Sequence, residues 1–186
     1  MKLMAHMIAT LAIIGIVSGG TLAVINNWAE PLIAANKKLV TENAIFLVQP
    51  SGKSYEKVKS KENEIYKVFD DNKELIGYSI VFTGNGFQGA IRSMVGLDKE
   101  LKKITSIEVL EQSETPGLGT RITEPSFKDQ FNGLETEPKI NWLKTPAEKP
   151  NEIMAITGAT ISSKSIVAIL NEGISKVRTL KEGGKL

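Results

Sequence analysis

The chain has 186 residues with a formal net charge of +2, no Cys and a single His. Its length supports one domain of ordinary size and an additional segment. The lack of Cys excludes disulfides, thiolate catalysis and iron–sulfur ligation by this chain. The only His is His6, in an apolar N-terminal run, so a His-based metal site or a Ser-His-Asp triad in the soluble part is excluded too. The sequence has no block of basic residues interleaved with aromatic residues, the pattern that would indicate a nucleic-acid partner.

The N-terminal run from Leu3 to Ile25 has no charged side chain. As a helix it would reach ~35 Å, enough to cross a hydrocarbon core of about 30 Å. A cleaved signal peptide is the alternative, but its apolar core would be shorter, and no convincing small-residue cleavage site follows here. Trp28 is well placed as an interfacial anchor. We therefore expect residues 1–28 to form an uncleaved transmembrane anchor.

Residues 29–63 are expected to be a connector of helical and polar segments. Residues 34–48 predict a helix that continues from the membrane, and Gln-Pro-Ser-Gly at 49–52 ends it. Residues 53–63 are polar and charged, which predicts a surface helix or loop.

From Glu64 onward the apolar period changes to two, which predicts strands over 65–69, 75–82, 90–97 and 104–110. Turn residues at 70–73, 84–86 and 98–103 separate them, so an antiparallel meander is expected. Ile76, Tyr78, Ile80 and Phe82 should share one face of the sheet. Residues 138–150 predict a surface connection with Trp142 docked on the core. A helix over 163–180 should bury one face, made of Ile166, Val167, Leu170, Ile174 and Val177.

These elements predict an α+β fold in which one face of an antiparallel sheet packs on helices. Two runs of small and hydroxyl residues lie at its loops. The first, Glu114-Thr115-Pro116-Gly117-Leu118-Gly119-Thr120, suits a type II turn with Gly117 at positive φ. Such a loop also has little side chain and can lie close to a flat ring, and the two interpretations are compatible.

The second run, Thr157-Gly158-Ala159-Thr160, lies where the last helix should begin. The unpaired N–H groups and the positive dipole end of a helix start can bind a phosphate. The alternative is an ordinary N-cap, in which Ser162 or Ser163 satisfies the first turn.

The second run and the hydroxyl residues after it resemble the flavinylation motif of the FMN-binding domain family. That family includes the G subunit of Rnf complexes and the C subunit of the sodium-pumping NADH:quinone reductase. Residues 114–120 resemble its other signature loop, and the segments at 86–89, 95–98 and 127–131 agree in order, so the resemblance covers residues 64–181. One departure is Met154, where the family usually has an acidic residue; Glu152 is nearby.

The resemblance implies that residues 64–186 form a domain that binds FMN covalently, with a phosphoester to Thr160. Lys164 is a candidate counter-charge to the phosphate, Thr157 a polar contact, and Thr115, Leu118 and Thr120 contacts to the ring. The other candidate cofactor-binding residues are Glu114, Gly117, Gly119, Gly158, Ala159, Ile161 and Ser162. No separate catalytic residue and no metal site are expected.

The resemblance also implies the function of a membrane-anchored electron-transfer subunit of an Rnf-type ferredoxin:NAD oxidoreductase that pumps ions. Its partners would be integral membrane flavin and iron–sulfur subunits and a flavin transferase. The N-terminus would be cytoplasmic and the domain periplasmic or extracellular. No G-x-G-x-x-G motif lies between a strand and a helix, so this chain should not bind NADH itself. The alternatives are a membrane-anchored solute-binding module without flavin and a stand-alone flavoprotein reductase.

Overall fold

The computed structural model describes residues 2–58, 64–184 and 186. The chain divides into two compact units, residues 1–40 and residues 41–186. A single helix, α1 (Lys2–Val48), provides the described part of the first unit and the start of the second. Among the described residues it is the one helix long and apolar enough to cross a membrane. Its large apolar side chains from Leu3 to Ile33 are exposed.

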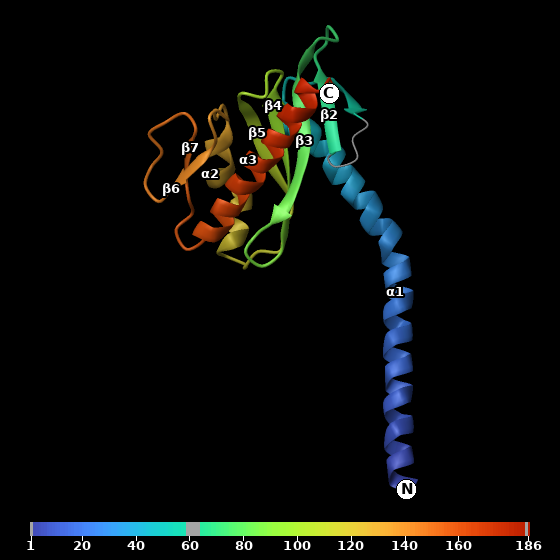
Figure 1. Ribbon diagram of the computed structural model, residues 1–186. Helices are drawn as coiled ribbons and strands as arrows, with labels where there is room; N and C mark the ends of the chain where they lie inside the picture. Colours follow the sequence, from blue (N-terminus) through green and yellow to red (C-terminus); the bar gives the residue numbers. More distant parts are fainter. Residues whose placement is uncertain (1, 59–63, 185) are drawn as a thin grey trace. The chain divides into compact units, whose positions relative to one another are not determined.

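The second unit is built on a five-stranded antiparallel sheet whose strands follow one another in sequence order, which confirms the predicted meander. Figure 1 shows the sheet with α3 across it. The strands are β1 (Ser54–Val58), β2 (Glu64–Phe69), β3 (Leu75–Asn85), β4 (Ala90–Asp98) and β5 (Ile104–Glu111).

Strand β1 corrects the expectation of a helix or loop over 53–63; the remainder, 59–63, lies outside the described residues. Its sequence, Ser-Tyr-Glu-Lys-Val, has no apolar alternation that would predict a strand, and four of its five residues are exposed. Its extended conformation comes from pairing with β2. Strand β3 runs on through Gly84 and Asn85, where a break was expected. Ile76 lies apart from Tyr78, Ile80 and Phe82. An irregularity in the β2–β3 register beside it sends Ile76 to the opposite face.

Helices cover both faces of the sheet rather than one. Helix α3 (Thr160–Glu182) packs on the first face, against Ile80 and Phe82 among others. It extends beyond the predicted 163–180 at both ends, and all five residues of its predicted apolar face are buried. The last turns of α1 pack on the second face, against Tyr66, Val68, Val81 and Met94.

The end of α1, and Gln49 directly after it, are held on the sheet by hydrogen bonds to backbone oxygens and by a close approach at a glycine. The Ser79 hydroxyl donates to the Ile45 carbonyl oxygen at 3.1 Å, and the Gln49 side-chain amide donates to the Leu97 carbonyl oxygen at 2.8 Å. A Cβ at Gly96 would lie 2.1 Å from the Val48 carbonyl oxygen. Only glycine therefore allows α1 to approach β4 so closely.

A buried guanidinium adds a polar link between α1 and the sheet. Arg92 donates to the Thr41 hydroxyl at 3.0 Å and to the carboxylates of Glu64 at 2.9 Å and Glu111 at 3.2 Å. Burial opposes ionisation of Glu64, but hydrogen bonds from Arg92 and Tyr66 outweigh it and lower its pKa. A lowered pKa in the folded state stabilises the fold at neutral pH, and this contribution is lost as the pH falls through it.

The remaining elements lie between β5 and α3. They are η1 (Gly119–Thr123), α2 (Pro125–Lys128), η2 (Asp129–Phe131) and the parallel pair β6 (Asn141–Leu143) and β7 (Glu152–Met154). The expected surface connection at 138–150 thus contains a strand. Trp142 in that strand is half-buried and packs against the core, as predicted.

Candidate functional site

Three segments meet around a hollow of about 280 Å³ in the second unit. They are the β3–β4 loop, the loop after β5, and the start of α3. The residues that line the hollow are Phe87, Thr115, Leu118, Gly119, Gly158, Ala159, Thr160, Ile161 and Ser162. The structure therefore brings together the two runs that the sequence singled out.

Helix α3 begins at this hollow, and the backbone N–H groups of its first residues have no partner within the helix. Gly158 has φ +85°, Ala159 is the N-cap residue and Thr160 is the first helical residue. The first bond of the helix runs from the Ser163 N–H to the Ala159 carbonyl oxygen at 3.1 Å. The N–H groups of Thr160, Ile161 and Ser162 precede it, so the positive end of the helix dipole is at Thr160.

The hydroxyls of the first turn do not cap the helix, so the alternative interpretation, an ordinary N-cap satisfied by Ser162 or Ser163, is wrong. The buried Ser163 hydroxyl accepts from the Ile156 N–H at 3.0 Å and donates to the Ala159 carbonyl oxygen at 3.1 Å. The buried Ser162 hydroxyl donates to the carboxylate of Glu114. Both are committed to protein partners, whereas Thr160 is half-buried and lines the hollow.

The loop after β5 contains the predicted tight turn. Gly117 has φ +74°, and the Leu118 N–H donates to the Thr115 carbonyl oxygen at 3.2 Å across the turn. The Thr120 hydroxyl accepts from the Gly117 N–H at 3.0 Å. Thr115 and Leu118 line the hollow, whereas Gly117 and Thr120 stabilise the loop behind it.

Glu114 begins this loop and is buried, with 4% of its surface exposed. One carboxylate oxygen accepts from the Phe87 N–H at 2.7 Å and the Gln88 N–H at 3.2 Å, and the other accepts from Ser162. The side chain thus connects all three segments of the site.

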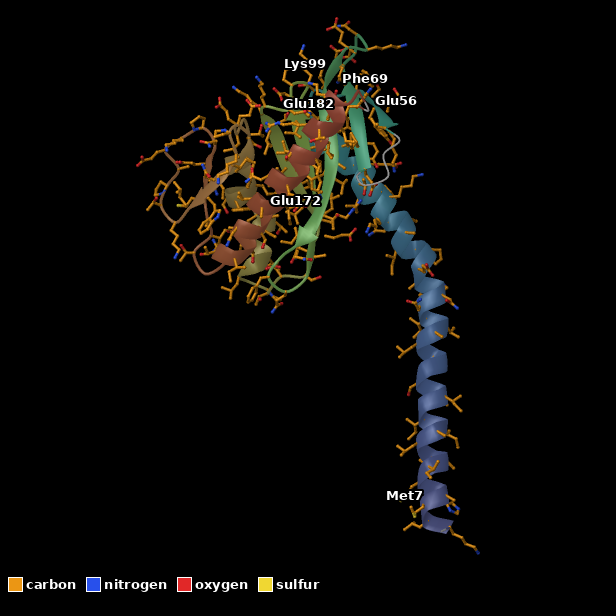
Figure 2. All side chains as sticks on the ribbon, viewed as in Figure 1. Met7, Glu56, Phe69, Lys99, Glu172 and Glu182 are labelled. Carbon is orange, nitrogen blue, oxygen red and sulfur yellow. The ribbon has the colours of Figure 1, made fainter. Side chains whose placement is uncertain are left out.

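Besides Glu114, Gly117 and Thr120, two further candidate residues do not line the hollow. Thr157 is exposed, in the turn before α3. Lys164 is also exposed, and it lines a neighbouring groove of about 410 Å³ between α3 and the end of β3. This groove continues along α3 to Glu172, which is labelled midway along the helix in Figure 2.

Sequence reasoning did not select Phe87 as a site residue, although it noted the segment that contains it. Phe87 is 59% exposed and lines the hollow together with the start of α3. An aromatic residue beside a glycine in a strand connection, Gly86-Phe87-Gln88-Gly89, was the available signal.

Met154, the departure from the family pattern, lies on β7. Its N–H donates to the Gln130 side-chain oxygen at 2.7 Å, and its carbonyl oxygen accepts from the Gln130 side-chain nitrogen at 3.2 Å. It does not line the hollow. Within the described ranges, no three His, Asp or Glu side chains converge in a way that could hold a metal ion.

Comparison with known proteins agrees with this geometry. The model of the FMN-binding domain matches residues 86–175, a range that includes all three segments of the hollow. The G subunit of the Na⁺-translocating ferredoxin:NAD⁺ oxidoreductase complex of Acetobacterium woodii is 31% identical, over 92% of this chain and 85% of that protein. The G subunit of the ion-translocating oxidoreductase complex of Methanosarcina acetivorans is 28% identical, over 95% of each chain.

The fold also resembles a solved structure. NqrC of Shewanella oneidensis superimposes with a TM-score of 0.55, over 68% of this chain and 67% of that chain. Its sequence identity is 18%, so this comparison supports the fold alone.

Proposed function

Since this chain belongs to the family of G subunits of ion-translocating oxidoreductase complexes and carries an FMN-binding domain, we propose that it relays electrons through FMN attached to Thr160. The observation that carries this proposal is the position of Thr160. It is the first residue of α3 and lines the hollow, while the two neighbouring serine hydroxyls are committed to other partners. Thr160 is thus the residue of this turn best placed to carry a group that lies in the hollow.

The start of α3 suits a phosphoester at Thr160. A phosphodiester keeps one negative charge, which the helix dipole and the N–H groups of Ile161 and Ser162 would stabilise. Gly158 has no side chain and turns the chain at positive φ, so it leaves space beside this charge. Lys164, one turn into the helix, would add a mobile counter-charge from the surface.

The hollow fits part of a flavin. Its volume is close to the lower limit of ligand sites, about 300 Å³. Apolar side chains of Phe87, Leu118 and Ile161 form its rim, and all three are about half exposed. When bound, FMN supplies the redox chemistry, and the residues of the chain bind and orient it. A site that covers only part of the ring leaves an edge accessible to a redox partner.

We propose further that the chain acts in a multisubunit membrane complex that couples ferredoxin and NAD to ion translocation, as the names of its relatives state for them. Integral membrane flavin and iron–sulfur subunits would exchange electrons with it, and a flavin transferase would load it. NADH would bind elsewhere in the complex.

The intact mass of the purified chain tests the proposal. A chain made in a host with the flavin transferase should be heavier than its sequence mass by one FMN minus one water, and its gel band should fluoresce. An unmodified chain would contradict the proposal and favour a solute-binding module. A flavinylated chain that never purifies with integral membrane subunits would favour a stand-alone reductase.

We predict the topology from the apolar helix and the family relationship: Lys2 inside the cell and residues from about Asn27 onward outside. Protease added to intact spheroplasts should digest the soluble domain and leave a short membrane-bound fragment. Protection in spheroplasts, with digestion in inverted vesicles, would reverse the assignment.

The tight turn after β5 gives a second prediction. Gly117→Val should strain the loop by about 1–2 kcal/mol, because a β-branched residue is unfavourable at φ +74°, although no atom crowds the position. We expect a shifted flavin spectrum with the covalent adduct retained. Gly117→Asn is the matched control, since Asn tolerates this conformation. Identical spectra for wild type and Gly117→Val would show that the turn does not shape the flavin environment.

A further inference from the structure

The carboxylate of Glu114 faces into the protein, away from the place where a ligand would lie. Thr115 and Gly119 from the same loop line the hollow, but Glu114 does not. Its two oxygens accept hydrogen bonds from the amides of Phe87 and Gln88 and from the hydroxyl of Ser162. A carboxylate with this many internal donors has little capacity left for a cofactor.

Two glycines leave the space that this carboxylate occupies. A Cβ at Gly86 would lie 2.2 Å from the first carboxylate oxygen, and a Cβ at Gly119 would lie 2.7 Å from the second. The same Cβ at Gly119 would also lie 2.7 Å from the Ser162 hydroxyl oxygen. Any side chain at either position would displace the carboxylate from its donors, so the three segments are shaped around Glu114.

The bonds of Glu114 connect two of the segments that line the hollow. The amide of Phe87 belongs to a residue that lines the hollow from the β3–β4 loop, and Ser162 lines it from α3, two residues after Thr160. Two loops that end in glycine-rich turns would otherwise be free to move independently. The spacing between the Phe87 ring and the start of α3 therefore depends on this one side chain.

Glu114 also brings a negative charge close to the hollow. Within the described part of the chain its hydrogen-bond partners are two amides and a hydroxyl, and none of them is a cation. Ser162, which donates to the carboxylate, and Gly119, where a Cβ would lie 2.7 Å from it, both line the hollow. At this burial the field of the charge is weakly screened and extends into the hollow.

We propose that Glu114 is a positioning residue of the flavin site, which fixes Phe87 relative to Thr160 and lowers the flavin potential with its charge. The effect on potential rests on the proposed function, whereas the effect on the loop does not. Reduction adds negative charge to a flavin, so a fixed negative charge nearby disfavours it.

Two substitutions in the full chain separate the two effects. In Glu114→Gln the side-chain oxygen can still accept from Phe87 and Gln88, and its NH₂ group can donate to the Ser162 hydroxyl, which reverses the direction of that one bond, so the charge is removed while all three contacts can persist. Glu114→Ala removes the charge and all three bonds. Glu100→Gln is the control, because Glu100 is an exposed carboxylate in the β4–β5 turn, at the end of β4 away from the site.

The first measurement is amide hydrogen exchange of the flavin-free chain. Glu114→Ala should speed exchange at Phe87 and Gln88 about tenfold, as expected for the loss of hydrogen bonds to a charged acceptor. Glu114→Gln should leave it near the wild-type rate. Unchanged exchange in a folded Glu114→Ala chain would overturn the positioning role.

The second measurement is the midpoint potential of the flavin-loaded chain. Glu114→Gln should raise it while the covalent adduct is retained, and Glu100→Gln should leave it at the wild-type value. Equal potentials in the two glutamine variants would overturn the effect of the charge. If the wild-type chain carried no flavin, the proposed function would fail, and hydrogen exchange would still decide the positioning role. Glu114→Gln preserves size, so it still decides the effect of the charge if Glu114→Ala does not fold.

Discussion

Replacing Thr160 with Ala should abolish the covalent flavin and leave the fold intact. The phosphoester requires a hydroxyl at this position, and the buried hydroxyls of Ser162 and Ser163 are engaged with Glu114, Ile156 and Ala159. The substitution removes little buried surface, and Ala is favourable in a helix, so stability should change by no more than about 0.5 kcal/mol. Intact mass should equal the sequence mass, and in-gel fluorescence should disappear.

Thr157→Ala is the matched control for this experiment. It makes the same chemical change at an exposed residue of the same motif, in the turn before the helix. We expect it to keep the adduct. Retention of flavin by Thr160→Ala, or its loss from Thr157→Ala alone, would assign the attachment to another residue.

Gly96→Ala should destabilise the domain strongly for a change of one methyl group. The new Cβ would lie 2.1 Å from the carbonyl oxygen and 2.9 Å from the carbonyl carbon of Val48, so it would collide with backbone. Relief requires α1 to move away from β4, which opens the packing of Ala44, Ile45 and Val48 on the sheet. Overpacking of this kind costs about 1–3 kcal/mol, and the rigid contact favours the upper end. Thermal unfolding of the second unit would measure it.

Gly183→Ala provides the comparison, because it adds the same methyl group where the nearest atom is 3.4 Å away and φ is −80°. Its effect on the free energy of unfolding should stay within about 0.5 kcal/mol. If the two variants melted alike, the end of α1 would not be packed on β4 as described.

The parts of the fold that the sequence predicted correctly are those with strong local patterns. The meander follows from period-two apolar segments, the buried face of α3 from helical spacing, and the turn at Gly117 from Thr-Pro-Gly. Strand β1 was missed because it is mostly exposed and depends on its neighbour for its conformation. The second helical layer was missed because the apolar residues at the end of α1 do not reveal which surface they pack against.

That the two signature runs bind a cofactor stays a prediction, but the structure does bring them to one place. They were expected to form one site, and they do surround one hollow. The roles of Ser162 and Ser163 were not predictable, since Glu114 is 48 residues away from Ser162 in the sequence. Local capping rules describe what a serine does near a helix start when no distant partner competes for its hydroxyl. Here tertiary partners do compete.

The order of elements along the chain has a consequence for biosynthesis. Helix α3 follows every strand of the five-stranded sheet, and it packs on one face of that sheet together with the short elements after β5. During translation the part of this face that α3 covers stays exposed until α3 has left the ribosome, while the other face can already pack on the end of α1. Thr160 is the first residue of that same helix. The acceptor hydroxyl and the cover of the core are therefore delivered together, so a nascent chain offers the folded acceptor site only once it can complete its core.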